Sequence, residues 1–118
     1  MRDGLVRIAA LTGVVCAVIA CEDGLVFDAV GSGEVSPESL AAEVTATTLA
    51  IKGMTIPLSS QEVHRFQFAT DKYEISALFV GRLLLLAVAQ TGTVLRTVQI
   101  ELAKVATELA QEEAKSWT

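Results

Sequence analysis

The apolar and polar positions of this chain follow two periods, one typical of helices and one typical of strands. Over residues 2–11 the apolar positions recur at helical spacing, until Gly13 interrupts them. Residues 14–21 are apolar at every position, as in a strand that is buried on both faces. Asp23-Gly24 separates this run from the mostly apolar residues 25–30, and such a pair predicts a β-hairpin turn because both residues tolerate positive φ. The chain is therefore expected to begin with a short helix and a hairpin.

A second helix is predicted over residues 37–52 by the signals at its two ends. Ser36 is a residue of the type that caps helices, and Pro37 suits the first helical position. Glu38 places a negative charge near the positive end of the helix dipole. Gly53 is a matching stop signal. Both ends of this helix are therefore expected to be fixed by the sequence.

Three strands and a long helix are predicted for the second half of the chain. In residues 62–69 polar and apolar side chains alternate, which indicates a half-buried strand. Residues 73–80 and 83–89 are expected to form two further strands joined by a two-residue turn, and the second of them is apolar on both faces. From about Thr93, apolar residues at helical spacing predict a long amphipathic helix. These residues are Leu95, Val98, Leu102, Val105 and Leu109.

The expected order of elements is helix, two strands, helix, three strands, helix. This order predicts an α+β fold with one antiparallel sheet of about five strands. The two fully apolar runs, 14–21 and 83–89, are expected to lie inside the sheet. No repeat, low-complexity tract or linker divides residues 1–118, so a single domain is expected.

The composition gives the chain more apolar surface than one small core needs. Apolar residues make up 52% of the 118 positions and charged residues 19%, against about 45–50% and about 25% in typical domains. The longest apolar runs are too short to supply the roughly 20 residues that cross a bilayer. A subunit interface is therefore favoured over a membrane span. A net charge of −5 with nine basic residues argues against nucleic acid as a partner.

The middle helix carries apolar residues on two opposite faces. At 100° per residue, we expect one of these faces to cover the sheet, and it contains Leu40, Val44, Thr47 and Ile51. The opposite face, called the small-residue stripe below, contains Ala42, Ala46, Leu49 and Ala50. A domain of this size has few layers with which to cover a second apolar face. The small-residue stripe therefore predicts self-association through this helix.

The amino-terminal segment also has a second interpretation. Arg2 and Arg7 precede an apolar run that ends at Cys21, and this pattern resembles a bacterial lipoprotein signal that is cut before the cysteine. Such a cut would remove the first apolar strand and leave the Asp23-Gly24 turn without a strand to pair. The hairpin is therefore favoured. Cys16 and Cys21 are then expected to be reduced residues of a cytoplasmic protein, unable to bridge each other because they point to opposite faces of one strand.

The sequence contains no recognisable catalytic or cofactor site. His64 is the only histidine, and no cysteine or carboxylate stands at a metal-ligand spacing from it. No Gly-x-Ser-x-Gly elbow or Ser-His-Asp set can be assembled from the few serines. Gly31-Ser32-Gly33 lacks the Gly-Lys-Ser/Thr of a phosphate loop and is interpreted as a spacer. The chain is therefore expected to be a binding protein and not an enzyme, and to use no cofactor.

The order of elements, the early Asp23-Gly24 hairpin and the helix opening Ser36-Pro37-Glu38 resemble the Roadblock/dynein light chain family, from about Leu5 to Leu109. Within this family the chain is similar to small bacterial members of the gliding-motility type, which are partners of Ras-like GTPases. The resemblance implies an α/β/α sandwich and a homodimer, in which two protomers join their sheets through the third strand and pair their middle helices. It also implies that the dimer reorganises the catalytic residues of the GTPase and supplies no arginine finger.

The resemblance also implies where the partners bind. The dimer interface is expected at Ala42, Ala46, Leu49, Ala50, His64 and Phe66. A GTP-loaded GTPase is expected to dock at the exposed end and flank of helix 37–52, at Glu38, Thr45 and Lys52. Other members of the family are scaffolds that stimulate nothing. A scaffold subunit with no effect on GTP hydrolysis, and an exported lipoprotein processed at Cys21, therefore stay open as alternatives.

Overall fold

The structure is a computed structural model that describes residues 1–59 and 62–116. In these residues, helices and strands follow one another in the predicted order. They are α1 (Arg2–Ala9), β1 (Val14–Cys21), β2 (Val26–Gly31), α2 (Pro37–Lys52), the short 3-10 helix η1 (Gly53–Thr55), β3 (Arg65–Ala69), β4 (Tyr73–Val80), β5 (Leu83–Gln90) and α3 (Leu95–Ser116). The predicted α+β element order is confirmed.

The strands form one antiparallel sheet in the order β2-β1-β5-β4-β3. The two strands that are apolar on both faces, β1 and β5, each pair with a neighbour on both sides, and most of their residues are buried. A strand in the interior of a covered sheet has no solvent face, which explains why its sequence does not alternate. The edge strands β2 and β3 are more exposed.

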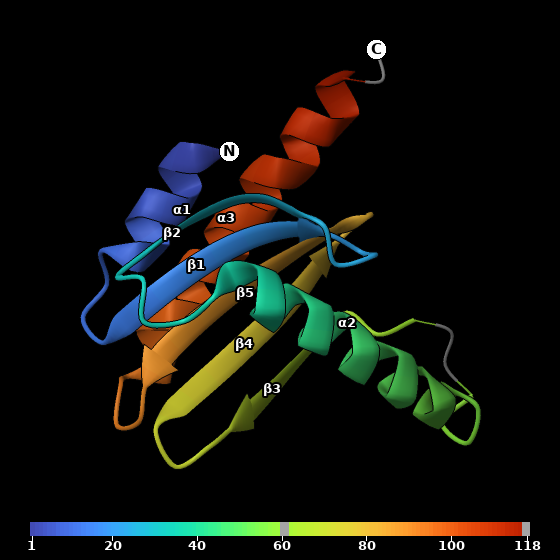
Figure 1. The fold of residues 1–118 in the computed structure, drawn as a ribbon. Helices are drawn as coiled ribbons and strands as arrows, with labels where there is room; N and C mark the ends of the chain where they lie inside the picture. The colour runs from blue at the N-terminus through green and yellow to red at the C-terminus, as the bar shows by residue number, and fades with distance from the viewer. Residues whose placement is uncertain (60–61, 117–118) are drawn as a thin grey trace.

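Helices cover both faces of this sheet, with α2 on one face and α1 and α3 on the other (Figure 1). The core under α1 and α3 includes Leu5, Ile8, Ile19, Leu85, Val98, Leu102, Val105 and Leu109. The core under α2 includes Cys16, Val18, Ala41, Val44, Leu84 and Leu86. Successive residues of β5 enter opposite cores because strand side chains alternate between the two faces. The molecule is the expected α/β/α sandwich.

The hairpin between β1 and β2 forms at the predicted turn. Gly24 has a φ of +95°, and the Asp23 carboxylate accepts a hydrogen bond from the backbone N–H of Leu25 at 3.1 Å. A chain cut before Cys21 would lose β1, the strand that joins β2 to β5. Cys16 is buried in this strand, and its burial raises the pKa of the thiol. The hairpin prediction is therefore confirmed.

The structure corrects two element boundaries and confirms the predicted bounds of the middle helix, residues 37–52. The first helix ends at Ala9 and not near residue 11. Gly53 follows the middle helix as its C-cap, as predicted, but its φ is −60° and not left-handed. The chain continues into η1, where the Thr55 hydroxyl donates to the carbonyl oxygen of Lys52 at 2.7 Å. That bond satisfies a helix-end carbonyl without a left-handed residue. The third strand begins at Arg65 and not at residue 62.

Candidate interaction surface

The start of α2 is held in place by side-chain hydrogen bonds. The Ser36 hydroxyl oxygen accepts a hydrogen bond from the backbone N–H of Ser39 at 3.3 Å, and Pro37 is the first helical residue, as predicted. In the segment before the helix, Glu34 accepts a hydrogen bond from the Tyr73 hydroxyl of β4 at 2.7 Å. This hydrogen bond raises the pKa of the Tyr73 phenol. The amino-terminal end of α2 is therefore anchored to the sheet.

The buried face of α2 differs from the predicted one at Thr47. Ala41, Val44 and Thr48 are buried against the sheet, whereas Thr47 is exposed. The Thr48 hydroxyl donates to the carbonyl oxygen of Val44 at 2.8 Å, so this polar residue can be buried without an unmet hydrogen bond. A helical wheel that ranks residues by hydropathy alone does not distinguish the two threonines. Leu40 and Ile51 from the predicted set are half-buried.

The opposite face of α2 is an uncovered apolar surface. All four residues of the small-residue stripe are exposed, and Leu49 retains 67% of its accessible surface. The apolar surface continues past the helix into three exposed side chains, Met54, Ile56 and Leu58. Figure 1 shows no other described element over this side of α2. Sequence reasoning missed the three residues after the helix because they lie in a segment without helical or strand periodicity, although three large apolar residues in one short loop are themselves a signal.

A groove of about 530 Å³ beside the carboxy-terminal half of α2 brings several predicted residues together. Its lining includes Thr45, Leu49, Lys52 and His64. The carboxylates of Glu22 and Glu62 also line it, so the groove presents both signs of charge. The Thr45 hydroxyl oxygen is buried near Gly24 of the β1–β2 turn and has no hydrogen-bond partner among the described residues. Glu38 lies near the other end of α2, roughly 10 Å along the helix from Thr45 and roughly 20 Å from Lys52 at 1.5 Å per residue, and it does not line this groove.

The edge strand β3 carries exposed aromatic side chains on the same face of the sheet as α2. Phe66 is half-buried, and its ring centroid lies 6.4 Å from that of Phe68 and 6.5 Å from that of Phe79. Phe68 retains 40% of its accessible surface. His64 is exposed and precedes the strand, although its carbonyl oxygen accepts a hydrogen bond from the backbone N–H of Phe79 at 2.8 Å. No strand of the described chain pairs with the outer edge of β3.

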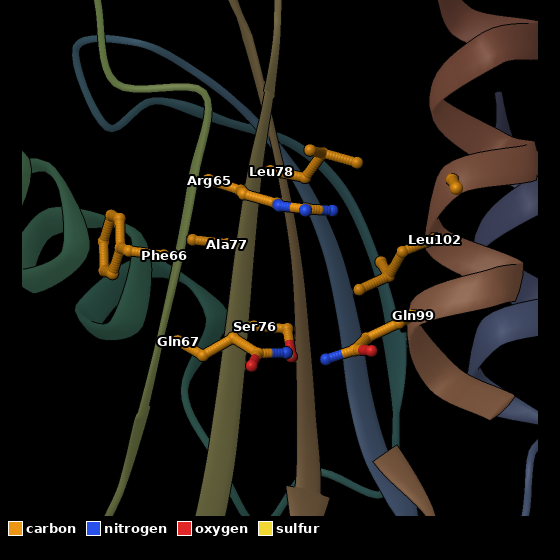
Figure 2. A pocket seen from close by; sticks show the side chains of 9 residues that line it. Arg65, Phe66, Gln67, Ser76, Ala77, Leu78, Gln99 and Leu102 are labelled. Atoms are coloured by element: carbon orange, nitrogen blue, oxygen red, sulfur yellow. The ribbon is translucent and has the colours of Figure 1, made fainter. Parts of the chain in front are cut away.

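A second groove, of about 520 Å³, lies on the opposite face of the sheet between β3, β4 and α3 (Figure 2). Arg65 and Gln67 of β3 line one side, and Gln99 and Leu102 of α3 line the other. On the floor, the Gln67 amide nitrogen donates to the Ser76 hydroxyl at 3.1 Å. Sequence reasoning assigned no role to these residues. The alternation in residues 62–69 placed Arg65 and Gln67 on one face but could not show that α3 leaves that face open.

The described residues contain neither a metal-ligand cluster nor a membrane-spanning helix. No group of three or more histidine, cysteine, aspartate or glutamate residues in residues 1–59 and 62–116 could hold a metal ion. In the same part of the chain, every helix is too short or too polar to cross a bilayer. The described surface includes the two grooves above, an uncovered helix face and a free strand edge.

Solved structures share this arrangement over almost the whole chain. Myxococcus xanthus MglB has a TM-score of 0.86 at 17% sequence identity, over 96% of this chain and 94% of that protein. A Roadblock/LC7 domain from Streptomyces avermitilis has a TM-score of 0.86 at 15% identity, over 97% and 98%. The gliding protein MglB from Thermus thermophilus has a TM-score of 0.83 at 16% identity, over 93% and 85%. The chain has the Roadblock/LC7 fold.

The Roadblock/LC7 fold is the one that the sequence resemblance implies, so that prediction is confirmed. Neither the known family models nor the curated proteins give a match to this chain. At 15–17% identity, likeness of structure establishes the Roadblock/LC7 fold and leaves the role of each residue to be argued from the surface itself. The residues predicted to contact a second copy or a GTPase stay predictions.

Proposed function

We propose that this chain is a homodimeric, non-catalytic regulatory module that binds a Ras-like small GTPase and modulates its GTP hydrolysis or its localisation. The observation that carries the proposal is the uncovered apolar face of α2 on a Roadblock/LC7 fold. An apolar helix face that is exposed in a single chain is typical of a protein–protein interface. The resemblance to GTPase-partner members of the family supplies the class of partner.

The dimer part of the proposal uses two surfaces at once. The small-residue stripe lets a second α2 approach closely, because alanine side chains are small and leave room for two helix backbones to come near each other. The free edge of β3 offers unpaired N–H and C=O groups to a second β3. Phe66 and Phe68 lie beside that edge on the α2 face, which supports an interface that uses both surfaces. A solved MglB is described with a tetrameric arrangement, which favours assembly of similar chains.

The GTPase part of the proposal places the partner on the α2 side of the dimer. Lys52 and Thr45 line the groove next to the helix, so a partner that fills the groove contacts both residues. Glu38 is exposed at the amino-terminal end of α2 and would contact a partner that covers the whole helix. In this arrangement the GTPase hydrolyses GTP with its own catalytic residues. The module changes the rate of hydrolysis by holding those residues in one conformation.

Single-turnover GTP hydrolysis separates a regulator from a scaffold. We expect that titrating the purified protein into a GTP-loaded Ras-like GTPase from the same organism changes the hydrolysis rate until the rate reaches a plateau. A variant of α3, Ala110→Glu, should have the same effect as the wild type, because Ala110 is exposed on the other face of the sheet. If the two proteins bind and the rate stays constant throughout the titration, the scaffold function replaces the regulatory one.

We also infer that the protein acts in the cytoplasm, where Ras-like GTPases and reduced cysteines are found. The position of β1 inside the sheet supports this inference, because lipoprotein processing before Cys21 would remove most of a central strand. Mass spectrometry of the protein isolated from its host tests the inference. A mature chain that begins at a lipid-modified Cys21 would contradict it.

A further inference from the structure

One carboxylate oxygen of Glu74 is buried without a hydrogen-bond partner. Glu74 lies on β4 opposite Ala69 of β3, and its Oε2 atom has no partner among the described residues. Glu74 lines a small pocket together with Gln67, Ser76 and Leu95 of α3. Gln67 and Ser76 also line the groove between β3, β4 and α3, so the two pockets are adjacent. A buried carboxylate oxygen without a donor is costly. A donor from outside the chain would satisfy it.

The hydrogen bonds of β3 determine which of its residues face the free edge. His64 and Thr70 each form a backbone hydrogen bond with β4, to Phe79 and Tyr73 respectively. Backbone direction alternates along a strand, so residues 64, 66, 68 and 70 direct their N–H and C=O groups toward β4. The N–H and C=O groups of Arg65, Gln67 and Ala69 therefore point outward, where no strand of the described chain pairs with them.

A second copy of β3 can satisfy all of these groups in one antiparallel register. Outward-facing residues must lie opposite outward-facing residues, and the whole of Arg65–Ala69 is used only if Gln67 lies opposite Gln67 of the partner subunit. In this register Arg65 lies opposite Ala69 of the partner subunit, because the two residues flank Gln67 at equal distances on either side. Side chains directly opposite each other point to the same face of the sheet.

We propose that Arg65 of the partner subunit crosses Ala69 and forms an ion pair with Glu74, so that each groove is completed by the other chain. This inference rests on the proposed homodimer and adds its register and its polar contacts. Arg65 of the partner subunit and Glu74 are separated by two strand spacings, roughly 10 Å between Cα atoms. The methyl side chain of Ala69 between them leaves the path open. Two long charged side chains span this distance.

The charge and exposure of Arg65 fit this role. Its side chain is exposed and has no ion pair in the part of the chain that the structure describes. In the single chain it lies over β4 near Leu78 (Figure 2), and a change of rotamer turns its guanidinium group to the free edge. The two-fold symmetry of the dimer repeats the ion pair, so the two half-buried Glu74 carboxylates and the two exposed guanidinium groups pair with one another.

The same register also pairs the aromatic residues on the other face of the sheet. Phe66 lies opposite Phe68 of the partner subunit, because these residues are the immediate neighbours of Gln67 on its two sides. The exposed ring of Phe68 would then be covered by a cross-strand aromatic contact, which is one of the favourable pairs in antiparallel sheets. One register therefore pairs the free backbone groups of β3, brings a cation to the Glu74 carboxylate and covers the exposed ring of Phe68.

Charge reversal tests the ion pair in the intact protein. Arg65→Glu and Glu74→Arg should each raise the dimer dissociation constant at least about tenfold, because each leaves a like-charge pair in the interface. The double variant Arg65→Glu/Glu74→Arg should restore dissociation to within about threefold of the wild type, because it forms an opposite-charge pair again with the two charges exchanged. Lys72→Glu removes a cation at the exposed β3–β4 turn and should have little effect. Dissociation is measured by sedimentation equilibrium.

Cysteine cross-linking tests the register even if Glu74→Arg fails to fold. In a Cys16→Ala/Cys21→Ala background, Gln67→Cys should form an intersubunit disulfide on oxidation, because the paired Cα atoms lie about 5.5 Å apart. Arg65→Cys should not, because Arg65 and Arg65 of the partner subunit are about 13 Å apart along the strands. A dimer that is unaffected by charge reversal, or that cross-links through Arg65→Cys and not Gln67→Cys, overturns the register and the ion pair. A wild-type chain that stays monomeric overturns the proposed homodimer as well.

Discussion

Replacing Ala46 with glutamate is expected to convert the dimer into folded monomers. Ala46 is exposed on the outer face of α2 in the single chain, so the substitution leaves both cores unchanged. In the proposed dimer the same position faces a second α2, where a charge would lose its water without gaining a partner. An unpaired buried charge costs about 3–5 kcal/mol, which corresponds to at least about a hundredfold weaker association.

Sedimentation velocity of Ala46→Glu at the concentration at which the wild type is dimeric checks this expectation. Circular dichroism spectra confirm whether the variant is folded. Ala110→Glu is the matched control, because it makes the same change on an exposed face of α3, away from the small-residue stripe. A dimer that is as stable in Ala46→Glu as in Ala110→Glu would exclude the small-residue stripe as the interface.

Leu85→Ala is expected to cause the largest loss of stability of the single chain. Leu85 lies on β5, the central strand, and 0% of its surface is exposed. It belongs to the core under α1 and α3, where the truncated side chain would leave a cavity. Substitutions of this kind lower the free energy of unfolding by about 2–5 kcal/mol, out of roughly 5–15 kcal/mol for a whole domain.

Urea unfolding measures this loss as a lower midpoint. Leu25→Ala is the matched control, because Leu25 follows the β1–β2 turn and retains 63% of its surface. We expect the control to change the free energy of unfolding by less than about 0.5 kcal/mol. Equal losses for Leu85→Ala and Leu25→Ala would mean that β5 is not the centre of the sheet.

The elements and their order could be predicted because each has a local cause in the sequence. The runs 14–21 and 83–89 are apolar throughout, and only an interior strand buries both of its faces. Ser36 and Pro37 fix the start of α2 whatever the rest of the chain does. The pair Asp23-Gly24 likewise fixes the hairpin through local backbone preferences. Local signals of this kind are enough to give the fold class.

The remaining features depend on contacts between distant segments. Thr48 is buried and Thr47 exposed because of the way α2 rests on the sheet, which no helical wheel specifies. Arg65 and Glu74 share one face of the sheet because β3 pairs with β4, and their separation of nine residues in the sequence does not show this. The sequence therefore predicts the elements better than it predicts the surface.

The central claim is that this Roadblock/LC7 fold binds a Ras-like GTPase through the α2 side of its dimer. Isothermal titration calorimetry with a Ras-like GTPase from the same organism, loaded with either a non-hydrolysable GTP analogue or GDP, tests it most directly. We predict saturable binding of the GTP-analogue form, weaker binding of the GDP form, and no binding to Ala46→Glu. Absence of binding in both nucleotide states would contradict the proposed function, and equal binding to wild type and Ala46→Glu would contradict the proposed surface.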